Sequence, residues 1–315
     1  MTKRTLRLAC LSLLVLGCAQ RLAHPDVSED RVRGQIEDDA PAAFAATVGA
    51  YDRVLRIGER LRVENASACG DAIASSLGWS AVADRDFGGL EMRRLATQFL
   101  RAGKSPVVVA LAPQGAAERA GVQVGDHVLS IDGHSVHTSV QVTHAEQTLA
   151  PTGASIAVER AETELELAVT PARACLPDVR PTELSAIGAW PWNGSIYVSL
   201  RLVELATDDQ IAFSIAHALA QQLLGVDPQR ANQHVPEPQA TALAVLLCER
   251  AGFSVADIEP ILELEAVEEP WTVITTVNPL ANPYWRPKGD TWLGEIPRRI
   301  VALKMVRAKD ASAQH

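Results

Sequence analysis

The sequence contains few aromatic residues and few positive charges. Aromatic residues make up 4% of the 315 positions, and 29 Lys and Arg stand against 38 Asp and Glu, which gives a net charge of −9. Because contacts to nucleic-acid phosphates need clustered Lys and Arg, we expect no nucleic-acid partner. A hydrophobic fraction of 47% and a charged fraction of 21% are ordinary for globular proteins and exclude a disordered or collagen-like chain. Beyond the N-terminal segment, no apolar run is long enough to span a bilayer.

The N-terminal segment has the pattern of an export signal. Basic residues precede an apolar run over 8–16, which is about half as long as a membrane-spanning helix needs to be. The run ends in Val-Leu-Gly-Cys at 15–18, which resembles the lipobox of bacterial lipoproteins. The resemblance implies a signal peptide over 1–17 and a lipid on the thiol of Cys18. The alternative is a plain secretory signal with an incidental Cys. Ala19 stands where an inner-membrane retention signal has Asp, so the resemblance implies a periplasm-facing anchor in the outer membrane.

Five cysteines are too few for a disulfide-dense scaffold, and two of them, Cys10 and Cys18, belong to the N-terminal segment. An oxidising periplasm permits one disulfide among the other three and leaves an odd thiol. Cys69 and Cys175 bracket one segment and are the preferred pair. Cys248 lies in an apolar helical run, where a buried core thiol is expected. The sequence does not fix this pairing.

The chain is expected to form an α+β protein with two domains. Polar residues over 18–40 lack apolar periodicity and predict a tether. Helical spacing of apolar residues over 41–66 predicts an amphipathic helix that packs on the C-terminal domain. Short β runs between turn residues predict a small, partly open β-barrel over 67–172, and the chain over 173–310 is predicted to be mainly helical.

Individual elements follow from the same patterns. In the first domain the predicted strands are 77–82, 106–111, 127–131, 154–160 and 164–169, and the predicted helices are 90–100, 115–120 and 140–149. In the second domain we predict a strand over 195–198, an irregular segment over 270–289, and helices over 208–224, 237–251, 254–265 and 297–307.

The run over 115–133 resembles the central signature of bacterial PDZ domains. A short helix is followed by a turn at Gly121, by Gly125-Asp126 at the start of a strand, and by Asp132-Gly133 at its end. The resemblance implies a domain that binds extended peptides by adding them as a strand to an exposed sheet edge.

The family's carboxylate-binding turn is a glycine between two apolar residues, and the sequence has this pattern at 77–79. The resemblance implies that backbone N–H groups there bind a peptide's terminal carboxylate, with the helix over 140–149 as the opposite wall. The implied peptide-binding residues are Leu77, Gly78, Trp79, Val140, His144 and Gln147. Two alternatives remain open: Leu77 and Trp79 fill the core of a degenerate groove, or an added helix over 87–101 covers the groove.

The segment over 207–221 is similar to the active-site helix of gluzincin metallopeptidases related to HtpX and the CAAX prenyl proteases. Members of this family carry His-Glu-x-x-His on that helix, a Glu on the next helix, and a later His-Pro segment. The two His bind one Zn²⁺ and the first Glu activates the metal-bound water, while the second Glu completes the site. Some periplasmic members have an inserted PDZ domain, in the order found here.

This sequence retains His217 and Glu237 of that site and departs elsewhere. Ala218 replaces the base, Gln221 the second His, and Leu293 the His of the later segment. Loss of the base alone lowers a rate by about 10²–10⁴, and loss of an imidazole removes a metal ligand. The resemblance therefore implies a domain that is no longer catalytic and has no cofactor.

The sequence thus predicts a lipid-anchored envelope protein that binds peptide C-termini or envelope proteins without cutting them. One alternative is an active zinc metalloendopeptidase with His217, His234 and Glu237 as ligands. Another is a structural envelope protein whose domains only pack together. A third is an unrelated helical domain in which His217 is an ordinary buried residue.

Overall fold

The computed structural model describes residues 29–267, apart from 88, 104, 184–185, 193 and 226–236. The chain divides into two compact units at Pro41, which lies inside the first described helix. The second unit contains the rest of that helix and every other described helix and strand. Cys18, His234, Leu293, the segment over 270–289 and the predicted helix over 297–307 lie outside the described residues.

Helix α2 (Glu29–Glu64) begins well before the predicted helix. The predicted tether over 18–40 is therefore helical from Glu29 onward. Side chains on this polar stretch can interact along the helix, as Gln35 does when it donates to Asp39 at 3.0 Å. Farther along, Val54, Ile57 and Leu61 form the buried stripe of α2. They share one hydrophobic cluster with residues of the C-terminal sheet and helices.

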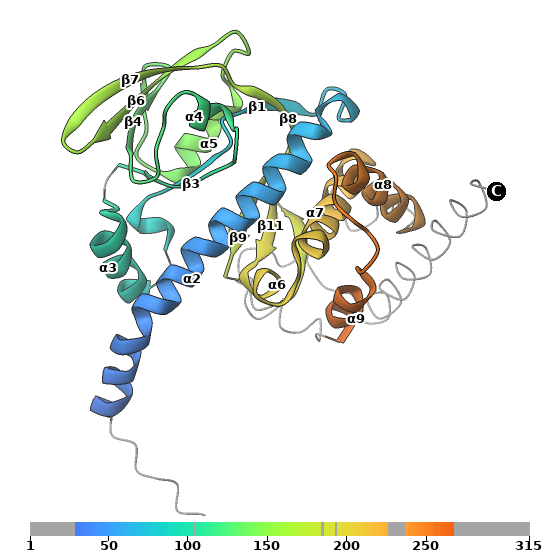
Figure 1. The fold of residues 1–315 in the computed structure, drawn as a ribbon, viewed down its shortest axis with the longest axis horizontal. Coiled ribbons are helices and arrows are strands. Elements are labelled where there is room, and N and C mark those ends of the chain that lie inside the picture. Colours follow the sequence, from blue (N-terminus) through green and yellow to red (C-terminus); the bar gives the residue numbers. More distant parts are fainter. Residues whose placement is uncertain are drawn as a thin grey trace, which may run out of the picture. The chain divides into compact units, whose positions relative to one another are not determined.

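The central domain is built on an open antiparallel sheet (Figure 1). Its strand order is β2 (Trp79–Val82), β3 (Val107–Leu111), β4 (His127–Ile131), β6 (Ala154–Arg160) and β7 (Thr163–Val169), and β5 (His134–Ser135) pairs with β4. In the described part of the chain β2 and β7 do not pair with each other. The domain is PDZ-like, as predicted, but the described strands do not close into a barrel.

Helices pack on the central sheet and complete its core. The helices here are η2 (Asp84–Asp86), α3 (Gly89–Leu100), α4 (Ala116–Arg119) and α5 (Ser139–Gln147). Ala116 and Ala117 of α4 and Val142 of α5 pack with the sheet residues Val108 and Ile156 in one buried cluster. These side chains therefore form the core between the helices and the sheet.

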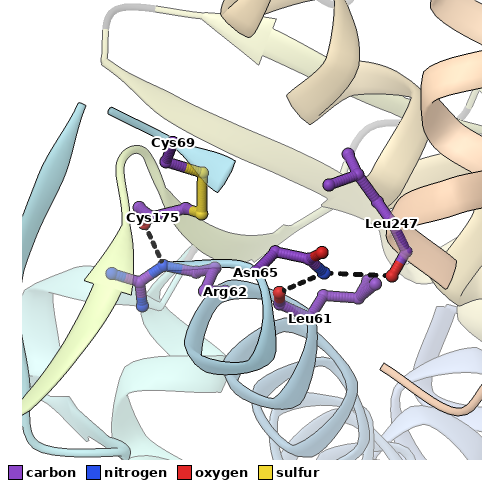
Figure 2. The surroundings of a disulfide bond; sticks show 6 residues. All are labelled: Leu61, Arg62, Asn65, Cys69, Cys175 and Leu247. Atoms are coloured by element: carbon purple, nitrogen blue, oxygen red, sulfur yellow. Dashed lines mark hydrogen bonds between the residues drawn. A yellow bond between two sulfur atoms is a disulfide. The ribbon is translucent and has the colours of Figure 1, made fainter. Parts of the chain in front are cut away.

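Both ends of the domain are tied together by a strand pair and a disulfide. After η1 (Ala66–Ala68), β1 (Ile73–Ser76) pairs with β8 (Ala172–Cys175), a strand pair that the sequence did not predict. Cys69 and Cys175 form the disulfide with a Cα–Cα distance of 5.6 Å, so the preferred pairing is confirmed (Figure 2). Cys248 is a buried free thiol, as expected, and burial raises its pKa well above the ordinary value.

The same region joins the end of α2 to the C-terminal helices. Arg62 donates from Nε to the carbonyl oxygen of Cys175 at 2.9 Å, and Asn65 donates to the carbonyl oxygens of Leu61 and Leu247 at 2.9 and 3.0 Å (Figure 2). The buried N–H donors of Arg62 and Asn65 thus have backbone acceptors, whereas Oδ1 of Asn65 has no hydrogen-bond partner among the described residues.

The C-terminal region combines a small sheet with helices. The strand order is β10 (Ala189–Trp192), β11 (Ser195–Ser199) and β9 (Asp178–Thr182), and β9 runs parallel to β11. The helices are α6 (Leu200–Leu205), α7 (Asp208–Leu223), α8 (Glu237–Arg250) and α9 (Glu259–Val267). The mainly helical prediction therefore missed β9 and β10, and α9 begins five residues after the predicted start at 254. The sequence signal for α7 is clear, because Thr207 and Gln210 form a capping box at its start.

None of the helices within the described residues combines the length and the apolar character that crossing a membrane would require.

Candidate functional site

A cavity of about 280 Å³ lies along the β2 side of the central sheet. All four residues of β2 line it, and α5 provides a second wall. Residues of α2 and β9 and Tyr197 of β11 also line the cavity. Among the described residues β2 pairs only with β3, so its other edge faces the cavity. An unpaired strand edge beside a cavity can accept another strand.

The turn before β2 requires glycine. Gly78 has a φ of +68°, and a Cβ there would stand 3.2 Å from the Cα of Gly115 and 3.3 Å from a carboxylate oxygen of Glu59. The turn is held to the start of α4, since Ala117 N–H donates to the carbonyl oxygen of Leu77 at 2.8 Å. The expected turn over 77–79 is therefore a well-defined element at one end of the cavity.

The two apolar residues that flank Gly78 are differently placed. Leu77 is completely buried and belongs to the core of the domain. Trp79 is also buried in that core, but it lines the cavity as well. One alternative is that Leu77 and Trp79 only fill the core. This holds for Leu77, whereas Trp79 both fills the core and lines the cavity.

A carboxylate from α5 occupies the inner side of this turn. Glu146 Oε1 accepts a hydrogen bond from the N–H of Leu77 at 2.6 Å, and its Oε2 accepts one from Nε1 of Trp79 at 3.0 Å. Ser76 Oγ lies 3.1 Å from Oε1 of Glu146 and donates to Oε2 of Glu59 at 2.8 Å. Two side-chain carboxylates therefore meet at one hydroxyl group.

The electrostatics of Glu146 reflect this placement. Burial raises the pKa of its carboxyl to about 7, and the negative charge of Glu59 acts in the same direction. The hydrogen bonds from Leu77 and Trp79 and the positive charge of Arg62 lower that pKa but do not offset burial. Arg62 stands 3.2 Å from Glu59, which gives the Glu59 charge a buried partner.

The helical wall differs from the expected set. Val140 and Gln147 line the cavity, as predicted, whereas His144 is exposed and is absent from its lining. Thr138 caps α5 by accepting a hydrogen bond from the N–H of Gln141. Sequence reasoning missed Glu146, which lies two residues beyond His144 on the same helix.

The added helix does not cover the groove. Of the described residues that line the cavity, none belongs to α3, although Asp86 of η2 does. Phe87, just before α3, packs against Phe44 of α2 with ring centroids 5.4 Å apart. This contact holds the segment beside α2 instead.

The second predicted site lies on α7. His217 is 4% exposed, Ala218 is buried in the same core, and Gln221 is partly buried one turn later. Glu237 is the first residue of α8, which packs on α7. Within the described part of the chain, no three His, Cys, Asp or Glu residues are grouped so that they could hold a metal ion. Of the positions 217, 218 and 221 that carry the family's motif, only His217 offers a zinc ligand, and the alternative ligand His234 lies outside the described residues.

Comparison with known proteins identifies the central domain. The PDZ domain family matches residues 107–159, and the chain therefore contains a PDZ domain. Over 58 residues the chain is 47% identical to a Vibrio cholerae protein named "Putative zinc metalloprotease", a match that covers 18% of this chain and 13% of that protein. The relationship to a metalloprotease thus extends over a short segment of both chains.

Two solved structures resemble parts of the chain. A PDZ domain of HtrA3 bound to a phage-derived ligand (FGRWV) is 24% identical, with a TM-score of 0.21, over 23% of this chain and 67% of that one. The HtrA-type protease AlgW with a decapeptide is 24% identical, with a TM-score of 0.27, over 33% of this chain and 30% of that one.

Proposed function

We propose that this protein is an envelope lipoprotein that binds extended peptide segments in the groove of its PDZ domain and does not cut them. The observation that carries the proposal is the unpaired edge of β2, which lines a cavity of about 280 Å³ opposite α5. A strand edge of this kind offers main-chain hydrogen bonds to any extended ligand.

The backbone of β2 supports strand addition. Ala112 N–H donates to the carbonyl oxygen of Gly78 at 2.7 Å, so this carbonyl group faces β3. In an antiparallel pair, successive residues direct their backbone groups to opposite edges, and those of Trp79 therefore face the groove. Apolar side chains from both walls, including Val82 and Val140, are available to the ligand's side chains.

Binding without cleavage is supported by the residues of α7. Ala218 has no proton acceptor, and the amide of Gln221 is a poor zinc ligand. The C-terminal region would then be a gluzincin-like scaffold that has kept its helices and lost its chemistry. Lipidation at Cys18 would hold the protein on the outer membrane, facing the periplasm, where partner segments would come from envelope proteins.

Peptide capture by variants of the groove tests the proposal. The probe is a library of random ten-residue peptides presented to the purified full-length protein. Val140→Arg places a large charged side chain in the groove, at a position that is 62% exposed and so tolerates it. The matched control is Val124→Arg, because Val124 is 60% exposed and does not line the cavity.

We expect the wild-type protein to select peptides, Val140→Arg to lower their affinity at least about tenfold, and Val124→Arg to leave it unchanged. Equal affinities for the wild type and Val140→Arg would contradict the proposed groove. Selection of no peptides at all by the wild type would contradict peptide binding itself.

A further inference from the structure

The carboxylate-binding end of the groove already contains a carboxylate of the chain. Glu146 reaches from α5 to the turn over 77–79 and accepts hydrogen bonds from the N–H of Leu77 and from Nε1 of Trp79, at 2.6 and 3.0 Å. A ligand's terminal carboxylate could use these two donors only by displacing Glu146. Of the turn's N–H groups, the backbone N–H of Trp79 faces the groove and would remain open to it.

We propose that Glu146 permanently fills this turn, so that the groove accepts internal segments of proteins, joined to β2 through their main chain, and does not select free C-termini. This inference rests on the proposed function and specifies the class of ligand. The geometry that supports it consists of the contacts made by Glu146, the second carboxylate beside it, and the walls of the cavity.

The second carboxylate makes displacement by an acidic group unfavourable. Glu59 accepts from Ser76 Oγ at 2.8 Å, and one of its oxygens would lie 3.3 Å from a Cβ at Gly78. Glu59, Ser76 and Glu146 all line the cavity. A ligand carboxylate at this end would therefore meet the negative charge of Glu59, which is paired with Arg62, and that of Glu146 whenever Glu146 is ionised.

The raised pKa of Glu146 agrees with a side chain that remains in place. When it is protonated, Oε1 of Glu146 can donate to Ser76 Oγ, and Ser76 can continue to donate to Glu59. The three groups then form one continuous chain of hydrogen bonds. A neutral group held in this way fills the turn without an unpaired buried charge.

Internal segments fit the rest of the groove. The unpaired edge of β2 provides backbone donors and acceptors, which do not require a chain end. The walls also carry Asp86, Asp178 and Arg180, and Asp178 is already engaged with both Arg180 and Ser195. Among the described residues that line the cavity, both cations, Arg62 and Arg180, are thus already paired with carboxylates of the chain.

The test compares two forms of the random ten-residue library, one with free C-terminal carboxyl groups and one with C-terminal amides. The wild-type protein should bind matched members of the two forms with affinities within about threefold, because Glu146 already engages the N–H of Leu77 and Nε1 of Trp79 and its own carboxylate stands in the turn. Glu146→Ala frees the donors of Leu77 and Trp79. Free-acid peptides should then bind at least about tenfold more tightly than amides, as expected for a charge-assisted hydrogen bond.

Two further variants separate occupancy from charge. Glu146→Gln keeps the size of the side chain and one acceptor oxygen, which can still accept from the N–H of Leu77. Free-acid and amide peptides should therefore bind this variant with affinities within about threefold, as they do the wild type. Glu164→Ala, an exposed position on β7, is the matched control and should behave as the wild type does.

A spectroscopic readout needs no ligand. In the ¹⁵N-labelled protein, the amide proton of Leu77 and the indole proton of Trp79 should shift upfield in Glu146→Ala and stay in place in Glu164→Ala. If both resonances are unchanged in Glu146→Ala, Glu146 does not accept hydrogen bonds from Leu77 and Trp79, and the inference is wrong whether or not peptides bind.

The outcomes distinguish this inference from the proposed function. A wild-type preference of tenfold or more for free-acid peptides would overturn the inference and leave peptide binding intact. Failure of the wild type to bind either form would overturn the proposed function, and the ligand class with it.

Discussion

The ion pair between Asp126 and Arg160 explains why the PDZ signature places an aspartate after Gly125, and it gives a sharp prediction for stability. Asp126 is 1% exposed. Its Oδ1 accepts from Nε of Arg160 and its Oδ2 from Nη2 of Arg160, both at 2.7 Å, and Oδ2 also accepts from the N–H of Gln123 at 2.8 Å. Nη2 of Arg160 also donates to the carbonyl oxygen of Gly121 at 2.7 Å, so one guanidinium group joins β6 to both ends of the turn.

Asp126→Ala should lower the free energy of unfolding by about 3 kcal/mol. Breaking a buried ion pair by removing one partner costs about 3–5 kcal/mol. The lower end applies because the Arg160 side chain is 29% exposed, and water can solvate its charge after the aspartate is lost. Asp126→Asn keeps one acceptor oxygen and the shape of the side chain, so its cost should be smaller, about 1–2 kcal/mol.

Urea unfolding of the full-length protein, followed by far-UV circular dichroism, measures both variants. A double-mutant cycle with Arg160→Ala isolates the pair, and we expect a coupling free energy of about 2 kcal/mol or more. Glu164→Ala serves as the control for loss of a surface carboxylate. If Asp126→Ala costs less than about 0.5 kcal/mol, or if the coupling is close to zero, the pair does not hold the turn in this way.

Three further predictions concern the disulfide, the carboxyl of Glu146 and the site on α7. Because Cys69 and Cys175 are 106 residues apart, replacing both by Ser should lower the free energy of unfolding by about 4–5 kcal/mol relative to the oxidised protein, and a change below about 1 kcal/mol in urea unfolding would contradict the loop-closure argument. The pKa of Glu146 is raised from 4.5 to about 7, so the folded state binds the extra proton, and its contribution to stability should fall by up to about 3 kcal/mol as pH rises through that interval. Urea unfolding at pH 5 and pH 8 measures this change, and Glu146→Gln should remove it. If the stability of Glu146→Gln changes with pH as much as that of the wild type, Glu146 is not the group responsible. Metal analysis of the wild-type protein after reloading with zinc should find no bound zinc. The Gln221→His variant, which places a second imidazole one turn from His217, is analysed in parallel. One tightly held zinc in the wild type would restore the peptidase alternative.

Local signals allowed the sequence to predict part of this fold. The strands over 127–131 and 154–160 were predicted with the bounds of β4 and β6, because alternating apolar residues and the turn at 132–133 define them within a few positions. The helix α7 follows equally well from its capping box and apolar run. Such features depend on neighbouring residues, which a single sequence displays directly.

Pairing between distant segments could not be predicted in the same way. Strand β9 contains Pro181 and charged residues, which are unfavourable in strands. It is a strand because it pairs in parallel with β11, whose paired residues lie seventeen positions later in the sequence. The first turns of α2 present the opposite case, because a polar stretch without apolar periodicity can be helical or irregular. In both cases the deciding contacts lie outside the local pattern.

The candidate site shows the same division between local pattern and tertiary contact. The sequence located the turn at Gly78, because the pattern over 77–79 and the requirement for glycine are local. It did not locate Glu146, which is 69 residues from Leu77 and reaches the turn only because α5 is packed against β1 and β2. The motif specifies which donors exist, and the contact with Glu146 determines whether they are available. The ligand class of this groove therefore depends on a residue outside the motif by which the groove was recognised.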